Sequence, residues 1–111
     1  MIKIAIDAMG GDNSPKKIID AIKYHQSYNT NVYYKIFGDK DEINKLINNK
    51  IDKSKFDIVH TVNKVLSEDT PLEAAKRGKN TSMWLAIESV RNKDCDIVIS
   101  AGNTGALLVI S

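Results

Sequence analysis

The sequence predicts an α/β fold in which a mostly parallel sheet lies between two layers of helices. Three observations support this. Short β-rich segments alternate with segments of helical period along the 111 residues, helix-capping residues stand between them, and no internal repeat or low-complexity linker interrupts the order. Strands joined through helices form right-handed crossovers, which favour parallel pairing with helices on both faces. The length suffices for one hydrophobic core and not for two.

The first predicted strand and helix occupy the N-terminal quarter of the chain. Residues 2–6 form a short β-rich segment that predicts a strand. Ser14 followed by Pro15 predicts a helix that begins with Ser14 as N-cap and reaches about Tyr28. One face of this helix is marked by Ile18, Ile19, Ile22 and either His25 or Gln26.

A second strand and helix follow directly. Residues 32–37 predict a strand that ends at Gly38. Asp39 and Glu42 have the spacing of a capping box, which predicts that Asp39 caps the next helix. The inward face of that helix is formed by Ile43, Leu46 and Ile47.

The second half of the chain predicts two further strands separated by two helices. Residues 56–62 form the third strand, and residues 70–78 form a short helix. Asn80 or Thr81 caps a longer helix, and residues 96–100 form the fourth strand. The inward residues of the longer helix are Met83, Ala86, Ile87 and Val90.

Composition excludes several classes of protein. Apolar residues make up 42% of the chain and charged residues 27%, as in ordinary globular domains. The net charge is +2 with basic and acidic residues interspersed, so nucleic-acid binding is not indicated. The one cysteine, Cys95, cannot form an internal disulfide, which fits a reducing compartment. No apolar run approaches the ~20 residues that span a bilayer.

The loops that follow the predicted strands are the candidate binding elements, because open parallel sheets bind ligands at the carboxyl ends of their strands. Two of these loops, residues 7–15 and 100–105, are glycine-rich and run into helices. Glycine lets backbone N–H groups approach a ligand, and a helix N-terminus favours an anion. The spacing matches neither a dinucleotide fingerprint nor a P-loop. Two such loops on one edge favour an anion site, with purely structural turns as the alternative.

Three side chains near these loops have more than one interpretation. Asp7 and Asp12 flank the first glycine pair and could bind a metal or act as acid and base, but a strand-end Asp more often bonds turn amides. This structural role is favoured for Asp7. His60 is a possible base, although a packing role is commoner for a histidine in an apolar strand. His25 is expected on the surface of its helix.

Cations and hydroxyl groups gather before the longer helix of the second half. Lys79, Thr81 and Ser82 lie where a helix N-terminus is predicted, and Lys76 and Arg77 precede them. This arrangement can hold a phosphate. A solvated run of charges is the commoner outcome.

These motifs resemble those of the PlsX-type acyl-ACP:phosphate acyltransferases of bacterial phospholipid synthesis. The resemblance covers the whole chain in order. Its residues are the opening signature at 7–12 with Pro15, the strand end at 37–39, the middle segments at 68–71 and 75–83, and the glycine loop at 100–106. Two positions depart from the family pattern: Asn13 stands where the family usually has His, and Thr81 where it often has Ser.

The resemblance implies transfer of a fatty acyl group from acyl carrier protein to inorganic phosphate, which gives an acyl phosphate. It implies a three-layer α/β/α fold similar to isocitrate and isopropylmalate dehydrogenases, with no metal or organic cofactor. It also implies a cytoplasmic homodimer that associates peripherally with the inner face of the membrane.

We expect residues 1–111 to be the N-terminal part of a single acyltransferase domain. Family members are roughly three times as long, and the sequence ends on the apolar residues 106–110 and Ser111. We expect this part alone to be inactive, and the membrane-contacting element to lie in the missing part. A non-catalytic α/β fragment that at most binds an anion is the alternative. A nucleotide-dependent oxidoreductase is a weaker third.

For the transfer reaction, backbone amides and hydroxyl groups can hold phosphate and stabilise a tetrahedral oxyanion without a nucleophilic side chain. Asn103 and Thr104 are expected to contact the reacting groups. Asp7 and His60 are retained as structural or acid–base residues. The residues expected to bind phosphate are Gly10, Gly11, Asp12, Lys79, Thr81, Ser82, Gly102 and Gly105.

Overall fold

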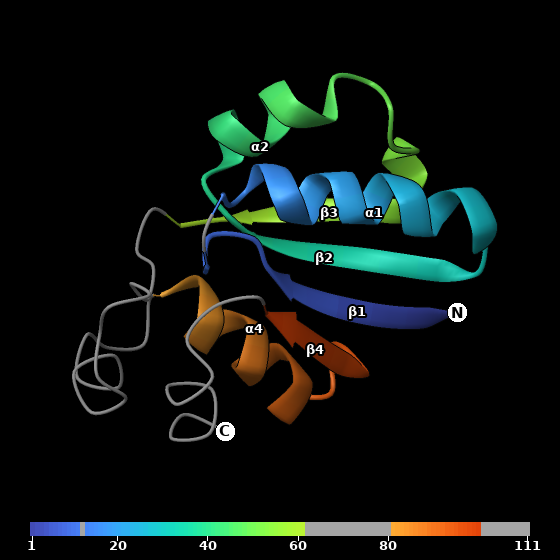
Figure 1. The fold of residues 1–111 in the computed structure, drawn as a ribbon. Coiled ribbons are helices and arrows are strands. Elements are labelled where there is room, and N and C mark those ends of the chain that lie inside the picture. Colours follow the sequence, from blue (N-terminus) through green and yellow to red (C-terminus); the bar gives the residue numbers. More distant parts are fainter. Residues whose placement is uncertain (12, 62–80, 101–111) are drawn as a thin grey trace.

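A computed structural model describes residues 1–11, 13–61 and 81–100 (Figure 1). It contains a 4-stranded parallel sheet with the strand order β3-β2-β1-β4. The strands are β1 (Ile2–Asp7), β2 (Val32–Gly38), β3 (Phe56–His60) and β4 (Ile97–Ser100). The helices are α1 (Lys16–Tyr28), α2 (Lys40–Ile47) and α4 (Ser82–Arg91), and a 3₁₀ turn, η1 (Lys53–Lys55), precedes β3. The predicted α/β fold with a parallel sheet is confirmed.

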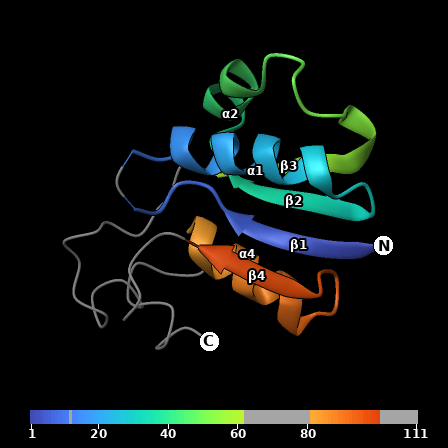
Figure 2. The ribbon, with the colours of Figure 1, turned by 45° about the vertical axis from the view of Figure 1, so that its right-hand side comes forward.

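Helices cover both faces of the sheet, because the direction in which successive strands are added across the sheet reverses after β3. From β1 through β2 to β3 it moves one way, and from β3 to β4 it returns past β2 and β1. Right-handed crossovers therefore place α1 and α2 on one face and α4 on the other. Figure 2 shows α1 in front of the sheet and α4 passing behind β4. The result is the predicted three-layer α/β/α arrangement.

The period-2 alternation of strand side chains builds a separate hydrophobic cluster on each face. In register, Ile4 pairs with Tyr34 and Ile6 with Ile36, and all four belong to the cluster under α1 and α2. This larger cluster also holds Ala8, Ile18, Ile19, Ile22, Val32, Ile43, Ile47 and Ile51. The smaller cluster under α4 consists of Ala5, Phe37, Ala86 and Cys95, with Val59, Leu85, Val90 and Val98 packed against it.

Helix α1 begins differently from the prediction. Pro15 occupies the N-cap position without a side-chain cap, and the helix starts at Lys16. The hydroxyl of Ser14 instead donates to the carbonyl oxygen of Gly10 at 2.5 Å. The prediction that Ser14 caps this helix is wrong, because its hydroxyl closes the preceding loop. Asn13, at a φ of 63°, turns the chain between the loop and the helix.

The other two predicted caps are confirmed. The Asp39 carboxylate accepts hydrogen bonds from the backbone N–H groups of Asp41 and Glu42. Thr81 Oγ1 accepts from the N–H of Trp84 at the start of α4. Both arrangements satisfy N–H groups that have no partner within the helix.

Two details differ from the sequence-based expectation. His25 is half-buried, because its Nδ1 lies 2.6 Å from the Tyr34 hydroxyl on β2. The third strand ends at His60, and the N–H of Thr61 donates to the carbonyl of Gly38 at 2.9 Å. The short helix predicted over residues 70–78 and the turn after β4 lie outside the described residues.

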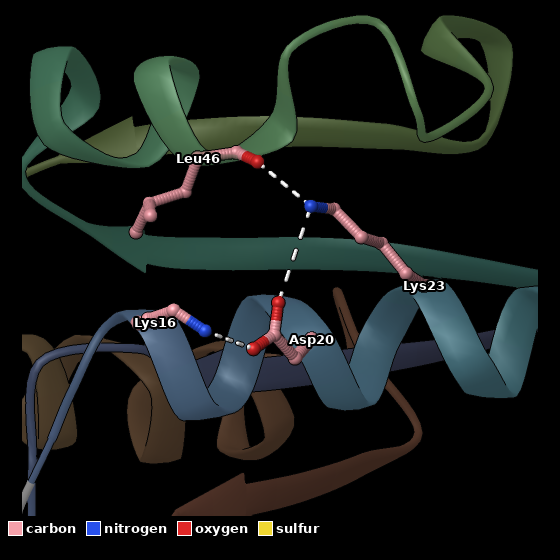
Figure 3. A network of polar contacts seen from close by, with 4 residues as sticks. All are labelled: Lys16, Asp20, Lys23 and Leu46. Carbon is pink, nitrogen blue, oxygen red and sulfur yellow. Dashed lines mark hydrogen bonds and ion pairs between the residues drawn. The ribbon is translucent and has the colours of Figure 1, made fainter.

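A lysine on α1 links the two helices of the larger face (Figure 3). Lys23 Nζ donates to the carbonyl oxygen of Leu46, in the last turn of α2, at 2.8 Å. Asp20 lies between two lysines of the same helix, 2.8 Å from Lys16 and 4.0 Å from Lys23. The contact to Leu46 satisfies a helix-terminal carbonyl and complements the α2 dipole.

An open apolar groove lies beside β4, on the face of the sheet that α1 and α2 cover. Ile97 and Ile99 of β4 are each 47% exposed, and none of the described helices covers them. The adjacent groove has a volume of about 300 Å³. Its lining includes Ile4, Ile6, Ile18, Ile22, Tyr34 and Ile99. No helix within the described ranges is long and apolar enough to cross a membrane.

Candidate functional site

The carboxyl ends of the four strands meet at one edge of the sheet, and α1, α2 and α4 begin at that edge (Figure 1). This arrangement follows from parallel strands, because each helix must start where its preceding strand ends. The N-terminal ends of helices carry unsatisfied N–H groups and a partial positive charge. The edge is therefore suited to an anionic ligand.

Asp7 is the centre of the hydrogen-bond network at this edge. It is the last residue of β1 and is fully buried on the α4 side of the sheet. Its Oδ1 accepts from Ser82 Oγ at 2.5 Å and from the N–H groups of Met9 at 3.2 Å and Gly10 at 3.3 Å. Its Oδ2 accepts from Ser100 Oγ at 2.7 Å. The predicted bonds between Asp7 and turn amides are present.

The first glycine loop is bonded at several points. The N–H of Ala8 donates to the carbonyl of Phe37 at 3.0 Å, and the next two N–H groups point to Asp7. Gly11 adopts a φ of 83°, a conformation that residues with a Cβ rarely take. The Gly10 N–H is therefore bonded inward, and Gly11 turns the chain beyond it.

The side chain of Met9 packs against Gly38, a contact that the sequence did not reveal. A Cβ on Gly38 would lie 2.8 Å from Met9 Cγ and 2.9 Å from Ile43 Cδ1. Gly38 therefore provides the space into which the first glycine loop inserts its methionine. From the sequence, Gly38 is predicted only as the end of a strand.

Thr81 and Ser82 place the N-terminus of α4 at the same edge. Both residues are buried. Thr81 caps the helix, and Ser82 donates to Asp7 across 75 residues of sequence. The carboxylate beside this helix N-terminus is in a favourable electrostatic position.

His60 lies at the end of β3, away from Asp7. β2 separates β3 from β1, so the two side chains are two strand positions apart. The His60 ring is exposed, and its Nδ1 accepts from the backbone N–H of Lys40 at 3.0 Å. His60 therefore contributes to the cap of α2 rather than packing in an apolar strand.

The remaining predicted site residues lie outside the described part of the chain: Asp12, Lys79, Gly102, Asn103, Thr104 and Gly105. The described edge brings Asp7, Gly10, Ser82 and Ser100 together. Ser100 was not predicted as a site residue. The sequence places both Asp7 and Ser100 at predicted strand ends on one edge, but only the structure shows that the two residues pair in register.

Shifted pKa values are found for Asp20 on α1, for Asp52 before η1, and for Tyr33 and Tyr34 on β2. A hydrogen bond from Lys16 lowers the pKa of Asp20, and hydrogen bonds from Ser54 lower that of Asp52. Burial raises the pKa of Tyr34, and burial together with Asp57 raises that of Tyr33. Within the described ranges, no three His, Cys, Asp or Glu residues form a group that could hold a metal ion.

Comparisons with known proteins identify relatives of this chain. The family model described as "Fatty acid synthesis protein" matches residues 2–111. A phosphate acyltransferase of Pelagibacter ubique strain HTCC1062 is 67% identical over 111 residues, which are 100% of this chain and 33% of that protein. Proteins of the same name from Pediococcus pentosaceus and Enterococcus faecalis strain V583 are 44% and 41% identical over 107 residues. Those matches cover 96% of this chain and 30% and 31% of the two relatives.

The chain thus spans about a third of the length of the curated relatives that it matches. The match runs through both glycine loops and through all four described strands. This chain belongs to the fatty acid synthesis protein family.

Proposed function

We propose that this chain forms part of an enzyme that transfers a fatty acyl group from acyl carrier protein to inorganic phosphate. The observation that carries the proposal is the convergence of a glycine loop and three helix N-termini on one sheet edge, in a chain of this family. The relatives named phosphate acyltransferase support the reaction class.

In the proposed reaction, a phosphate oxygen attacks the carbonyl carbon of the acyl thioester. A tetrahedral oxyanion forms, the carbon–sulfur bond breaks, and the sulfur of the carrier protein leaves as a thiol with the proton that the hydrogen phosphate gives up. The protein must hold phosphate in line with the carbonyl and stabilise the developing negative charge. Backbone N–H groups and hydroxyls can do both, so no nucleophilic side chain is required.

The residues at the edge have separate roles in this proposal. Because the N–H groups of Met9 and Gly10 are bonded to Asp7, phosphate would meet the loop from Gly11 onward. The glycines themselves allow close approach. The further proposed phosphate ligands are Asp12 and Ser82 through their backbone N–H groups, Lys79, Thr81, Gly102 and Gly105, because the Ser82 hydroxyl is bonded to Asp7. Asn103 and Thr104 would contact the reacting groups.

We also propose how this part belongs to a whole enzyme. Residues 1–111 would be the N-terminal part of one α/β acyltransferase domain, with the remainder supplying the opposite wall of the cleft. The complete protein would be a cytoplasmic homodimer that associates peripherally with the membrane. The open apolar groove beside Ile99 supports burial of this face by further polypeptide.

The test uses a fusion of residues 1–111 to the remaining part of the Pelagibacter ubique enzyme. Acyl phosphate formation from acyl carrier protein thioester and inorganic phosphate is measured, with the parent enzyme as positive control. We expect turnover by the fusion and none by residues 1–111 alone. A folded but inactive fusion beside an active parent would contradict the proposed reaction and favour a non-catalytic anion-binding fragment.

A further inference from the structure

The four donors that surround Asp7 come from three separate segments of the chain. Met9 and Gly10 belong to the loop after β1, Ser82 is the first residue of α4, and Ser100 is the last residue of β4. The latter two lie 75 and 93 residues away in sequence. One carboxylate therefore joins the loop after β1, the start of α4 and the end of β4.

The burial of Asp7 argues against a direct role in the chemistry. Its side chain is fully enclosed, and both oxygens already accept hydrogen bonds. A general base must come within hydrogen-bond reach of the proton that it removes. A buried carboxylate is tolerated when donors surround it, and these donors lose a buried acceptor if it is removed.

We propose that Asp7 is a positioning residue of the acyl-transfer site, a proposal that rests on the function proposed above. Asp7 holds the first glycine loop, the N-terminus of α4 and the end of β4 in one fixed arrangement without touching the substrate. The Gly11 amide and the N-terminus of α4 are then held at a set distance from the phosphate. A displacement of about 1 Å in such a site costs on the order of 10²-fold in rate.

The test compares Asp7→Asn with Asp52→Asn in the fusion with the Pelagibacter ubique remainder. Asp52 also accepts hydrogen bonds from a backbone N–H and a hydroxyl group, both of Ser54. Asp52→Asn therefore makes the same chemical change at a second hydrogen-bonded carboxylate. Asp52 precedes β3, at the opposite edge of the sheet from Asp7. We expect Asp7→Asn to raise KM for inorganic phosphate and lower kcat, together by about 10²-fold, and Asp52→Asn to change neither.

Two further measurements separate positioning from other roles. Combining Asp7→Asn with Ser82→Ala should add little to the loss of Asp7→Asn alone, because both act through one network. The pH profile of kcat should keep its shape in Asp7→Asn, whereas removal of a base would abolish its acidic limb. Loss of that limb with an unchanged phosphate KM would overturn the proposal.

The remaining outcomes are also decisive. Unchanged kinetics of a folded Asp7→Asn fusion would overturn the positioning role while leaving the proposed function intact. An inactive unsubstituted fusion beside an active parent would overturn both. Should Asp7→Asn fail to fold, Ser82→Ala and Ser100→Ala carry the test: a raised phosphate KM in the folded variants supports the proposal, and an unchanged KM in both overturns it.

Discussion

The two faces of the sheet differ in the side chains that they bury. Under α1 and α2 lies a cluster of mostly aliphatic side chains that also includes Tyr34. Under α4 the cluster is smaller and includes the small residues Ala5, Ala86 and Cys95. The buried carboxylate Asp7 and the hydroxyl of Ser82 lie on this second side.

The aliphatic side chains of one face and the hydrogen-bonded polar groups of the other contribute to the protein in different ways. Burial of large aliphatic side chains is a strong and non-directional source of stability. Hydrogen bonds between buried polar groups contribute less net free energy but depend on distance and angle. The face under α1 and α2 therefore supports the fold, and the face under α4 fixes the geometry of the edge. All variants below are made in the fusion used to test the proposed function.

The largest expected effect tests the aliphatic face. Ile36 is fully buried in the middle of β2, and Ile36→Ala should reduce the free energy of unfolding by about 2–5 kcal/mol through lost burial and a cavity. Denaturant titration measures this loss. Ile36→Val, as the conservative control, should cost about 0.5–1.5 kcal/mol. A changed phosphate KM in folded Ile36→Ala would show that the two faces are not separable.

The next largest effect is expected at Gly38, against which the first glycine loop packs Met9. Gly38→Ala places a Cβ within 2.9 Å of Met9 and Ile43, and such overpacking costs roughly 1–3 kcal/mol. Met9→Ala should relieve the clash, so the double variant should be more stable than the sum of the single losses predicts. Thermal melting of the four proteins decides this. Strict additivity would contradict a direct Met9–Gly38 contact.

Asp39 and Thr81 are a matched pair of helix caps that tests whether the cap of α4 also binds phosphate. Asp39→Ala and Thr81→Ala each remove a side-chain cap and should each cost about 0.5–2 kcal/mol. If Thr81 also binds phosphate, as proposed, only Thr81→Ala should raise the phosphate KM. Kinetics and melting curves are measured on both. Equal phosphate KM values would leave Thr81 with a capping role alone.

The smallest effect is expected on the exposed surface of α1. Asp20 pairs with Lys16 in solvent (Figure 3), and such pairs contribute little to stability. The Lys16 hydrogen bond lowers the pKa of Asp20, so the contribution is present above the unfolded pKa and is lost as the pH falls through the folded pKa. Asp20→Asn should therefore leave the melting temperature unchanged within error at neutral pH and slightly weaken its acid dependence. A large drop at neutral pH would contradict this assignment.

Much of this architecture is determined by the sequence itself. Alternating β-rich and helical segments predict the four parallel strands, and local capping chemistry predicts the N-termini of α2 and α4 correctly. These features depend on residues within a few positions of one another. Side-chain period and the satisfaction of helix-terminal N–H groups are local physical constraints, so the sequence expresses them directly.

Tertiary structure decided which polar groups bond to one another. Ser14 is a plausible cap by local chemistry, yet its hydroxyl bonds to Gly10. His25 reaches Tyr34, Gly38 accommodates Met9, and Asp7 binds Ser82 and Ser100. Each of these contacts depends on the strand register and on which face a helix covers. A hydrogen bond requires its two atoms within about 3 Å, and segments 75 or 93 residues apart meet at that distance only once the whole sheet has formed.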